Sequence, residues 1–126
     1  WIHTAAVLDY LISEPAQGKI ASQQGPLNIE LVEGKKHIEA LRDACKDAVR
    51  IGFKLESGIK QKDLIYRATA QIEKAGMTAV VANRLEDLGD KNKPRGYLVD
   101  SLGSHFVLDD TQKMCDAIRT FVERGV

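Results

Sequence analysis

The sequence has only two cysteines and no excess of charge of either sign. Cys45 and Cys115 stand alone, without a CxxC partner or a histidine at metal-binding spacing, so we predict free, buried thiols in a reducing cytosol. The 18 basic residues balance the 18 acidic ones, which excludes a general attraction for nucleic acid or anionic membranes. No apolar run approaches the roughly 20 residues of a membrane span, and no signal-peptide pattern is present. We therefore expect a cytoplasmic protein without nucleic-acid or membrane partners.

Several motifs that identify enzyme classes are missing as well. Neither GxGxxG nor GxxxxGK[ST] occurs, so neither familiar phosphate-binding loop lies in this segment. His3, His37 and His105 are scattered and share no metal-like spacing with cysteines or carboxylates. No serine-centred elbow indicates a hydrolase. We expect no metal site built from these residues.

The residues that are present fit one globular domain. A chain of 126 residues with 44% hydrophobic and 29% charged residues is long enough for one hydrophobic core but not for two. Trp1, Ile2 and His3 begin inside an apolar segment, with nothing ahead of them to form a neighbouring element. We interpret residues 1–126 as a single, partial domain whose N-terminal part is missing.

Apolar periodicity predicts strands that alternate with helices. The expected strands are residues 2–8, 27–32, 49–55, 78–82, 96–101 and 103–108, and the expected helices are residues 36–47, 61–75 and a last helix capped by Asp109 or Asp110. Residues 2–8 and 78–82 are apolar almost throughout, as in interior parallel strands, and Gly76 is expected to end the second helix. The charged residues 84–95 indicate a solvated loop. This order predicts a layered α/β fold with a mostly parallel sheet and an antiparallel hairpin near the C-terminus.

The end of the first expected strand has the composition of a ligand crevice. In open α/β sheets, ligands bind outside the carboxyl ends of the strands. The small side chains of Ala5 and Ala6 would let a ligand approach the backbone, and the carboxylate of Asp9 would accept hydrogen bonds from it. Ten residues later, Lys19 lies in a loop rich in Gly, Pro and Ser, from which it could neutralise a phosphate.

Two further strand ends point to the same edge of the sheet. Phe53 would place an aromatic face against a nucleobase, and the amide of Asn83 would pair with the edge of a base. Each candidate also has an ordinary structural interpretation. Asp9 and Asn83 are suited to cap turns, Lys19 to be a solvated loop lysine, and Phe53 to pack in the core. The convergence of three strand ends favours a site.

Five segments also resemble a known family. Ala5–Tyr10, Lys19–Ser22, Gly25–Leu27, Gly52–Glu56 and Val80–Asn83 are similar, in order and spacing, to the C-terminal part of phosphopantothenoylcysteine synthetase (phosphopantothenate–cysteine ligase), in the DNA/pantothenate metabolism flavoprotein family. The resemblance implies a Rossmann-like, three-layer fold. It also implies a ligase of coenzyme A biosynthesis that joins 4'-phosphopantothenate to cysteine through an acyl-nucleotide intermediate. CTP is favoured over ATP as co-substrate, with Mg²⁺ accompanying the nucleotide.

The resemblance assigns roles to individual residues. Nucleotide-binding roles fall to His3, Thr4, Ala5, Asp9, Lys19, Phe53 and Asn83, and substrate-binding roles to Ala5, Ala6 and Asp9. Lys19 would also be catalytic, because it would contact the phosphates and stabilise the transition state. The family further implies a homodimer with its active site at the subunit interface, and FMN only where a decarboxylase domain is fused to the ligase.

The chain departs from the family pattern at several positions. The Lys19–Ser22 segment replaces a lysine cluster, Gly34–His37 replaces a short nucleotide-binding segment, and Gln71 and Ala75 stand where lysines are expected. The family's phosphate-binding glycines and an essential asparagine precede this segment, so we expect the fragment to be incomplete for catalysis. Two alternatives remain open: a non-catalytic regulatory or scaffold domain of the same fold, and a flavin- or nucleotide-binding α/β domain.

Overall fold

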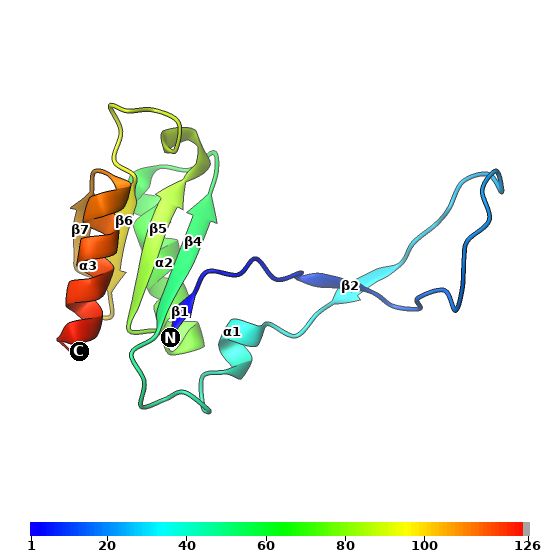
Figure 1. The fold of residues 1–126 in the computed structure, drawn as a ribbon, viewed down its shortest axis with the longest axis horizontal. Coiled ribbons are helices and arrows are strands. Elements are labelled where there is room, and N and C mark those ends of the chain that lie inside the picture. Colours follow the sequence, from blue (N-terminus) through cyan, green and yellow to red (C-terminus); the bar gives the residue numbers. More distant parts are fainter. Residues whose placement is uncertain (125–126) are drawn as a thin grey trace.

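The computed structural model describes residues 1–124 and contains a five-stranded mixed sheet. The strands are β1 (Ile2–His3), β4 (Ile51–Glu56), β5 (Ala79–Arg84), β6 (Gly96–Asp100) and β7 (His105–Leu108), in the order β1-β4-β5-β6-β7. The first three are parallel to one another, whereas β6 is antiparallel to both β5 and β7. All strands except β6 therefore point the same way (Figure 1).

Helix α2 (Gln61–Ala75) covers one face of the sheet (Figure 1). Its buried residues recur at spacings of three or four, which places them on one stripe; they are Leu64, Ala68, Ile72 and Ala75. This stripe packs against Val80 and Ala82 of β5 in one buried cluster. Gly76 ends the helix with a φ of 64°, a left-handed conformation that glycine adopts at low cost.

Helix α3 (Thr111–Glu123) covers the opposite face. Its N-cap is Asp110, whose carboxylate accepts a hydrogen bond of 2.7 Å from the backbone N–H of Lys113. Its apolar side packs against Val81 and Leu98 in a second cluster. The two clusters on opposite faces confirm the three-layer α/β arrangement. None of the helices that the structure describes has the length and apolar composition of a membrane span.

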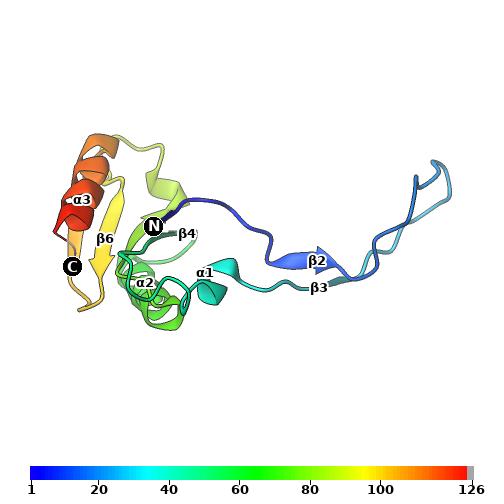
Figure 2. The ribbon, with the colours of Figure 1, turned by 60° about the horizontal axis from the view of Figure 1, so that its bottom comes forward.

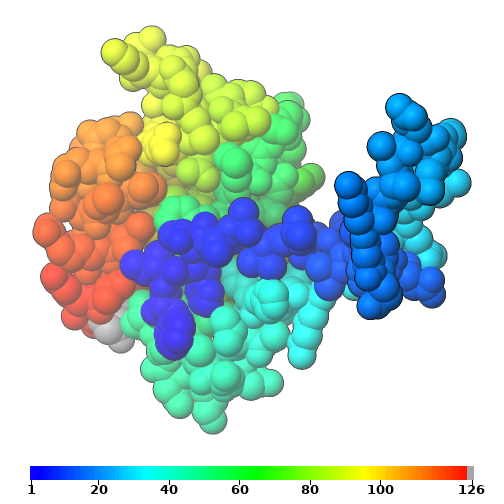
Figure 3. Space-filling view, turned by 45° about the vertical axis from the view of Figure 1, so that its right-hand side comes forward, coloured from blue at the N-terminus to red at the C-terminus, as the bar shows by residue number. Residues whose placement is uncertain are grey.

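An arm formed by residues 9–34 stands away from this body of sheet and helices. Strands β2 (Tyr10–Ile12) and β3 (Leu31–Glu33) pair antiparallel as a two-stranded ribbon. At its base, Gly34 N–H donates to the carbonyl of Asp9 over 2.8 Å. Every residue of both strands is exposed. Figures 1 and 2 show the arm extending far to one side of the body, and Figure 3 shows it clear of the packed surface.

Three expectations about the first 48 residues are wrong. Residues 2–8 do not form a buried interior strand: only Ile2–His3 pair with β4, and residues 4–8 are exposed. The second expected strand is shorter and shifted, to Leu31–Glu33, and it buries no face. The expected helix at residues 36–47 is reduced to α1 (His37–Ala40) followed by turns. Apolar periodicity exists in all three segments, but a segment is buried only where another element covers it.

Elsewhere the sequence-based expectations are close. The bounds of α2, the hairpin of β6 and β7, and the Asp110 cap are confirmed. Residues 84–95, expected to be a solvated loop, are only partly solvated. They contain a short 3-10 helix, η1 (Leu85–Asp87), in which Asp87 is buried. The cysteines are free but not buried as expected, since Cys115 is exposed and Cys45 is half-buried.

Candidate functional site

A cleft of about 920 Å³ lies beside the free edge of β4, between the segment that follows β1 and the side of α2. β1 pairs with β4 at only two positions, Ile2 with Ile51 and His3 with Gly52. The chain then leaves the sheet, so the rest of β4 has no neighbouring strand on that side within residues 1–124. This divergence opens the cleft at the carboxyl ends of parallel strands, where α/β proteins bind ligands.

Gly52 lets α2 lie close to β4. A Cβ atom at this position would lie 2.7 Å from the Cε of Met77 and 3.1 Å from the Nε2 of Gln71. The absence of a side chain therefore lets α2 approach β4 closely. The wall on the α2 side comes from Arg67, Gln71 and Lys74, which lie at helical spacing on one face.

The cleft carries more positive than negative charge. Five basic side chains line it (Lys35, Lys36, Lys54, Arg67 and Lys74) against three carboxylates (Asp9, Glu39 and Glu56). Each carboxylate already has a basic partner: Lys36 lies 3.8 Å from Asp9, Lys74 lies 2.9 Å from Glu39, and Lys54 lies 3.0 Å from Glu56. This surplus of cations suits an anionic ligand such as a phosphate ester.

Glu56 is the most strongly organised carboxylate of the cleft. Burial alone would raise its pKa, but the hydrogen bond and charge of Lys54 and the charge of Arg67 outweigh burial and leave the pKa lowered. The Nη1 of Arg67 donates to Glu56 over 2.8 Å, which ties α2 to the end of β4. The carboxylate therefore stays ionised and holds two cations at the edge of the cleft.

A buried arginine lies behind the inner end of the cleft. Arg50 is fully buried (0% exposed), and its guanidinium donates to the carbonyls of Ala75, over 2.6 Å, and Ile38, over 2.7 Å. Burial, and after it the charge of Arg50, lowers the pKa of His3. The Nε2 of His3 is buried without a hydrogen-bond partner among the described residues. Burial and the charge of Arg50 both favour the neutral imidazole of His3, which lines the cleft.

The structure brings together most, but not all, of the residues predicted for a site. His3, Thr4, Ala5, Ala6, Asp9 and Phe53 all line the cleft. Asn83 does not: it lies one strand away on β5, paired with Leu55 of the cleft edge. Lys19 does not either, because it lies in the arm beyond β2. Only a rearrangement or a second copy of the chain could bring Lys19 to a cleft of this kind.

Sequence reasoning missed several residues of the cleft. Arg67 and Lys74 are seven apart on a confirmed helix, so their shared face could have been predicted from helical periodicity. Lys54 could have been inferred from its place on the strand beside Phe53. Arg50 gave no such signal, because an isolated arginine near the start of a strand is usually exposed. Within residues 1–124, no three His, Cys, Asp or Glu side chains group as a metal site would need.

The model of a known protein family matches almost the whole chain. The family is described as the DNA/pantothenate metabolism flavoprotein C-terminal domain, and the match covers residues 1–122. The chain belongs to this family. Two curated members of similar sequence are bifunctional coenzyme A biosynthesis proteins called CoaBC. The protein from Thermococcus kodakarensis is 39% identical over 87 residues, and the one from Methanocaldococcus jannaschii is 37% identical over 84 residues.

A third relative of this flavoprotein C-terminal domain is a plant protein. Phosphopantothenate–cysteine ligase 2 from Oryza sativa subsp. japonica is 37% identical over 89 residues. The matched segments cover 67–69% of this chain but only 20–27% of the relatives. The chain therefore spans only a part of the length of the proteins it resembles.

Solved structures share the fold of this flavoprotein C-terminal domain. The DNA/pantothenate metabolism flavoprotein from Streptococcus pneumoniae superposes with a TM-score of 0.73 at 18% identity, over 95% of this chain and 62% of that one. A Cab2 mutant in complex with phosphopantothenate-cysteine superposes with a TM-score of 0.68 at 21% identity, over 97% of this chain and 42% of that one. At these identities the likeness establishes the fold alone.

Proposed function

We propose that the full-length protein containing this chain is a phosphopantothenate–cysteine ligase of coenzyme A biosynthesis. One observation carries the proposal: most of the residues predicted for a nucleotide and substrate site, all except Lys19 and Asn83, line one cleft with a surplus of positive charge. Membership of the flavoprotein family and the ligases among its relatives support the same activity.

The reaction would proceed in two steps. The carboxylate of 4'-phosphopantothenate attacks the α-phosphate of a nucleoside triphosphate, and pyrophosphate leaves. The amine of cysteine then attacks the acyl carbon, which forms the amide and releases the nucleoside monophosphate. Activation is needed because a free carboxylate is a poor acyl donor at neutral pH, and holding both reactants in place supplies much of the rate.

The cleft residues would serve these steps in distinct ways. The small Ala5 and Ala6 admit the substrate close to the backbone, and Asp9 accepts its hydrogen bonds. Phe53, with Asn83 on the adjoining strand, would hold the base. We favour CTP over ATP as the co-substrate, with Mg²⁺ on its phosphates. FMN would be bound only if a decarboxylase domain is fused to the ligase.

We also propose that the arm packs against a second copy of the chain. A two-stranded ribbon cannot bury its own side chains, and apolar residues cover this one: Tyr10, Leu11, Ile12, Ile20, Leu27, Ile29, Leu31 and Val32 are all exposed. An exposed apolar surface of this kind marks an interaction site. A homodimer would bury it and would carry Lys19 toward a cleft at the interface.

Pyrophosphate release by the full-length protein tests the ligase activity. We expect consumption of the nucleoside triphosphate only when 4'-phosphopantothenate is present. Orthophosphate in place of pyrophosphate would indicate acyl-phosphate chemistry and would contradict nucleotidyl transfer. Thermal-shift titrations with CTP, ATP and FMN separate the ligase from a flavin-binding domain, and no shift with any of them would favour a scaffold.

Light scattering on the full-length protein tests the dimer. Leu31→Asp places a charge on the arm and should convert the dimer to a monomer. The matched control is Val107→Asp, because Val107 is similarly exposed but lies on β7 of the body. A monomeric wild-type protein, or a dimer that only Val107→Asp disrupts, would contradict an interface at the arm.

A further inference from the structure

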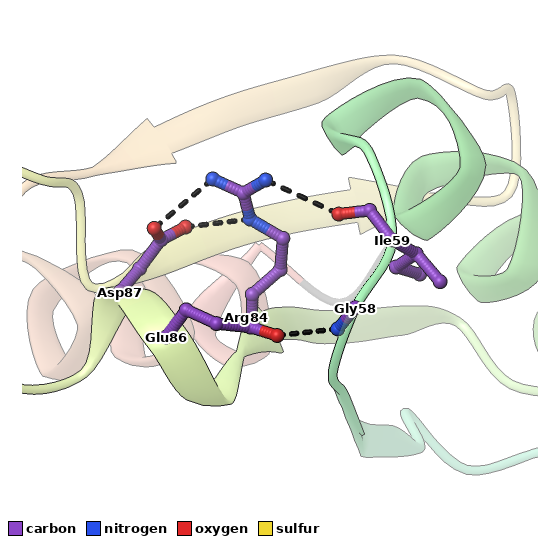
Figure 4. A network of polar contacts seen from close by, with 5 residues as sticks. All are labelled: Gly58, Ile59, Arg84, Glu86 and Asp87. Carbon is purple, nitrogen blue, oxygen red and sulfur yellow. Dashed lines mark hydrogen bonds and ion pairs between the residues drawn. The ribbon is translucent and has the colours of Figure 1, made fainter.

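Two loops at the carboxyl ends of β4 and β5 are joined by a network of charged contacts (Figure 4). Arg84, the last residue of β5, makes a two-point ion pair with Asp87: its Nε donates over 2.7 Å to one carboxylate oxygen and its Nη2 over 3.0 Å to the other. The Nη1 of Arg84 donates to the carbonyl of Ile59 over 3.2 Å. The carboxylate of Glu86 accepts from the backbone N–H of Gly58.

This network is more than a surface ion pair. Asp87 is only 6% exposed, so its charge would be costly to bury without the two donors of Arg84. Figure 4 shows the guanidinium of Arg84 lying between the carboxylate of Asp87 and the carbonyl of Ile59. Planar two-point pairing fixes orientation as well as distance. Each guanidinium nitrogen of Arg84 therefore has a defined partner.

The network holds the segment from which the cleft wall on the α2 side begins. Gly58 and Ile59 lie between the end of β4 and the start of α2, and Gly58 has a left-handed φ of 68° with no atom close to where a Cβ would be. Ile59 also packs against the buried cluster beneath α2, whereas nothing lies within 4 Å of where a Cβ of Gly58 would be. The contacts of this connection with Arg84 and Glu86 therefore help to hold the start of α2, the helix that carries Arg67.

The network also reaches the cleft through the sheet. Arg84 is the register partner of Glu56, the carboxylate that holds Arg67 and Lys54 in the cleft. Arg84 also directly follows Asn83, and successive side chains of a strand point to opposite faces. Asn83 and Arg84 therefore point to opposite faces, and the network anchors the strand end that carries both.

We propose that Arg84 and Asp87 are positioning residues for the nucleotide in the adjoining cleft. Neither residue lines the cleft, and they act by holding the ends of β4 and β5 and the start of α2 in register. This inference rests on the proposed function, since the nucleotide is the ligand whose binding it affects.

Steady-state kinetics of the full-length protein test this role. Asp87→Asn keeps the shape of the side chain but removes the charge of the pair. It should raise the KM for the nucleoside triphosphate roughly ten- to a hundredfold, the effect of a small misplacement of binding groups. Arg84→Lys, a milder variant that keeps the charge but loses the two-point geometry, should raise the KM less.

The chain supplies a matched control. Arg119 and Asp116 form an ion pair with the same three-residue spacing, at 2.9 Å, on α3 and away from the cleft. Asp116→Asn should leave the KM unchanged. If Asp87→Asn and Arg84→Lys lower the unfolding temperature but leave the KM of the folded protein unchanged, the pair is merely structural and the proposal is overturned.

A separate readout distinguishes this proposal from the proposed function. If the wild-type protein releases no pyrophosphate, the ligase activity fails, and hydrogen exchange at residues 58–60 then tests the network directly. Exchange should become faster in Asp87→Asn and not in Asp116→Asn. Equal protection in the wild type and in Asp87→Asn would overturn the positioning role.

Discussion

The strands β5 and β3 are both apolar, yet they differ completely in their surroundings. In β5, Val80 and Val81 are 0% exposed, whereas in β3 Leu31 is 56% exposed. β5 has a strand on each side and a helix over each face, while β3 has only β2 beside it. Strand-forming sequence is therefore common to the body and the arm. The side chains of a strand are buried only where other strands or helices pack against it.

The largest expected difference between the two regions is in stability. Leu64→Ala removes a fully buried side chain from the body and should lower the free energy of unfolding by about 2–5 kcal/mol. Leu31→Ala in the arm should change it by less than about 0.5 kcal/mol in the monomeric chain. Urea unfolding followed by circular dichroism measures both. Equal losses would show that the arm is part of the same folding unit as the body.

The next largest effect concerns activity. If Lys19 has the proposed role in the transition state, Lys19→Gln should lower turnover of the full-length protein about a hundred- to thousandfold, or about 2–4 kcal/mol. Nucleotide binding should weaken far less, and stability should not change. Lys62→Gln is the control, since Lys62 is exposed on α2 and lies outside the cleft. Turnover of Lys19→Gln within about threefold of wild type would make Lys19 an ordinary arm lysine.

A pair of glycines sharpens the comparison on a smaller scale. Gly76 and Gly25 both have a left-handed φ. A Cβ added at Gly76 would lie 2.9 Å from the Cγ of Arg42, whereas a Cβ added at Gly25 would have no atom within 4 Å. Gly76→Ala should cost about 1–2 kcal/mol of stability. Gly25→Ala should leave the unfolding midpoint of the body nearly unchanged, because the arm does not pack on it. A loss as large for Gly25 would mean that the arm is coupled to the core.

The smallest effect is a pH dependence at the junction of the two regions. Burial, followed by the positive charges of Arg50 and the N-terminus, lowers the pKa of His3 below its ordinary value of 6.5. The unfolded chain then binds more protons than the folded one, so stability falls as the pH drops below 6.5 and levels off below the folded-state pKa. Urea unfolding at pH 7.5 and 5.5 should show a weaker pH dependence in His3→Gln. An identical dependence would contradict the shift.

The sequence predicts the body well and the arm poorly, for a physical reason. Residues 61–75 carry a helical stripe, a terminal glycine and an apolar strand immediately after them, so local and tertiary signals agree. Residues 2–8 and 27–32 also look like strands, but nothing in residues 1–124 covers them. An apolar sequence pattern indicates that a strand needs to be covered, but it does not say which element covers it. Under the proposed dimer, a second copy of the chain would cover the arm.

The site shows the same division. Ala5, Asp9 and Phe53 line one cleft as predicted, but the chain leaves the sheet after His3, so only Phe53 lies on a strand. The strand-end argument also included Asn83, which lies outside the cleft. The position of Lys19 could not be predicted, because a residue in a long loop can lie anywhere that the loop leads. Arg50 escaped prediction because its partners are backbone carbonyls, which every residue has.

β1 accompanies β4 at only two positions, so the end of β4 keeps one row of peptide groups free toward the cleft within the described chain. Peptide donors and acceptors are supplied by every residue except proline, which lacks the donor. Mutations can change the side chains along this edge of β4 without removing its backbone N–H and C=O groups. A ligand bound through this edge would therefore keep its main-chain hydrogen bonds when the cleft side chains change.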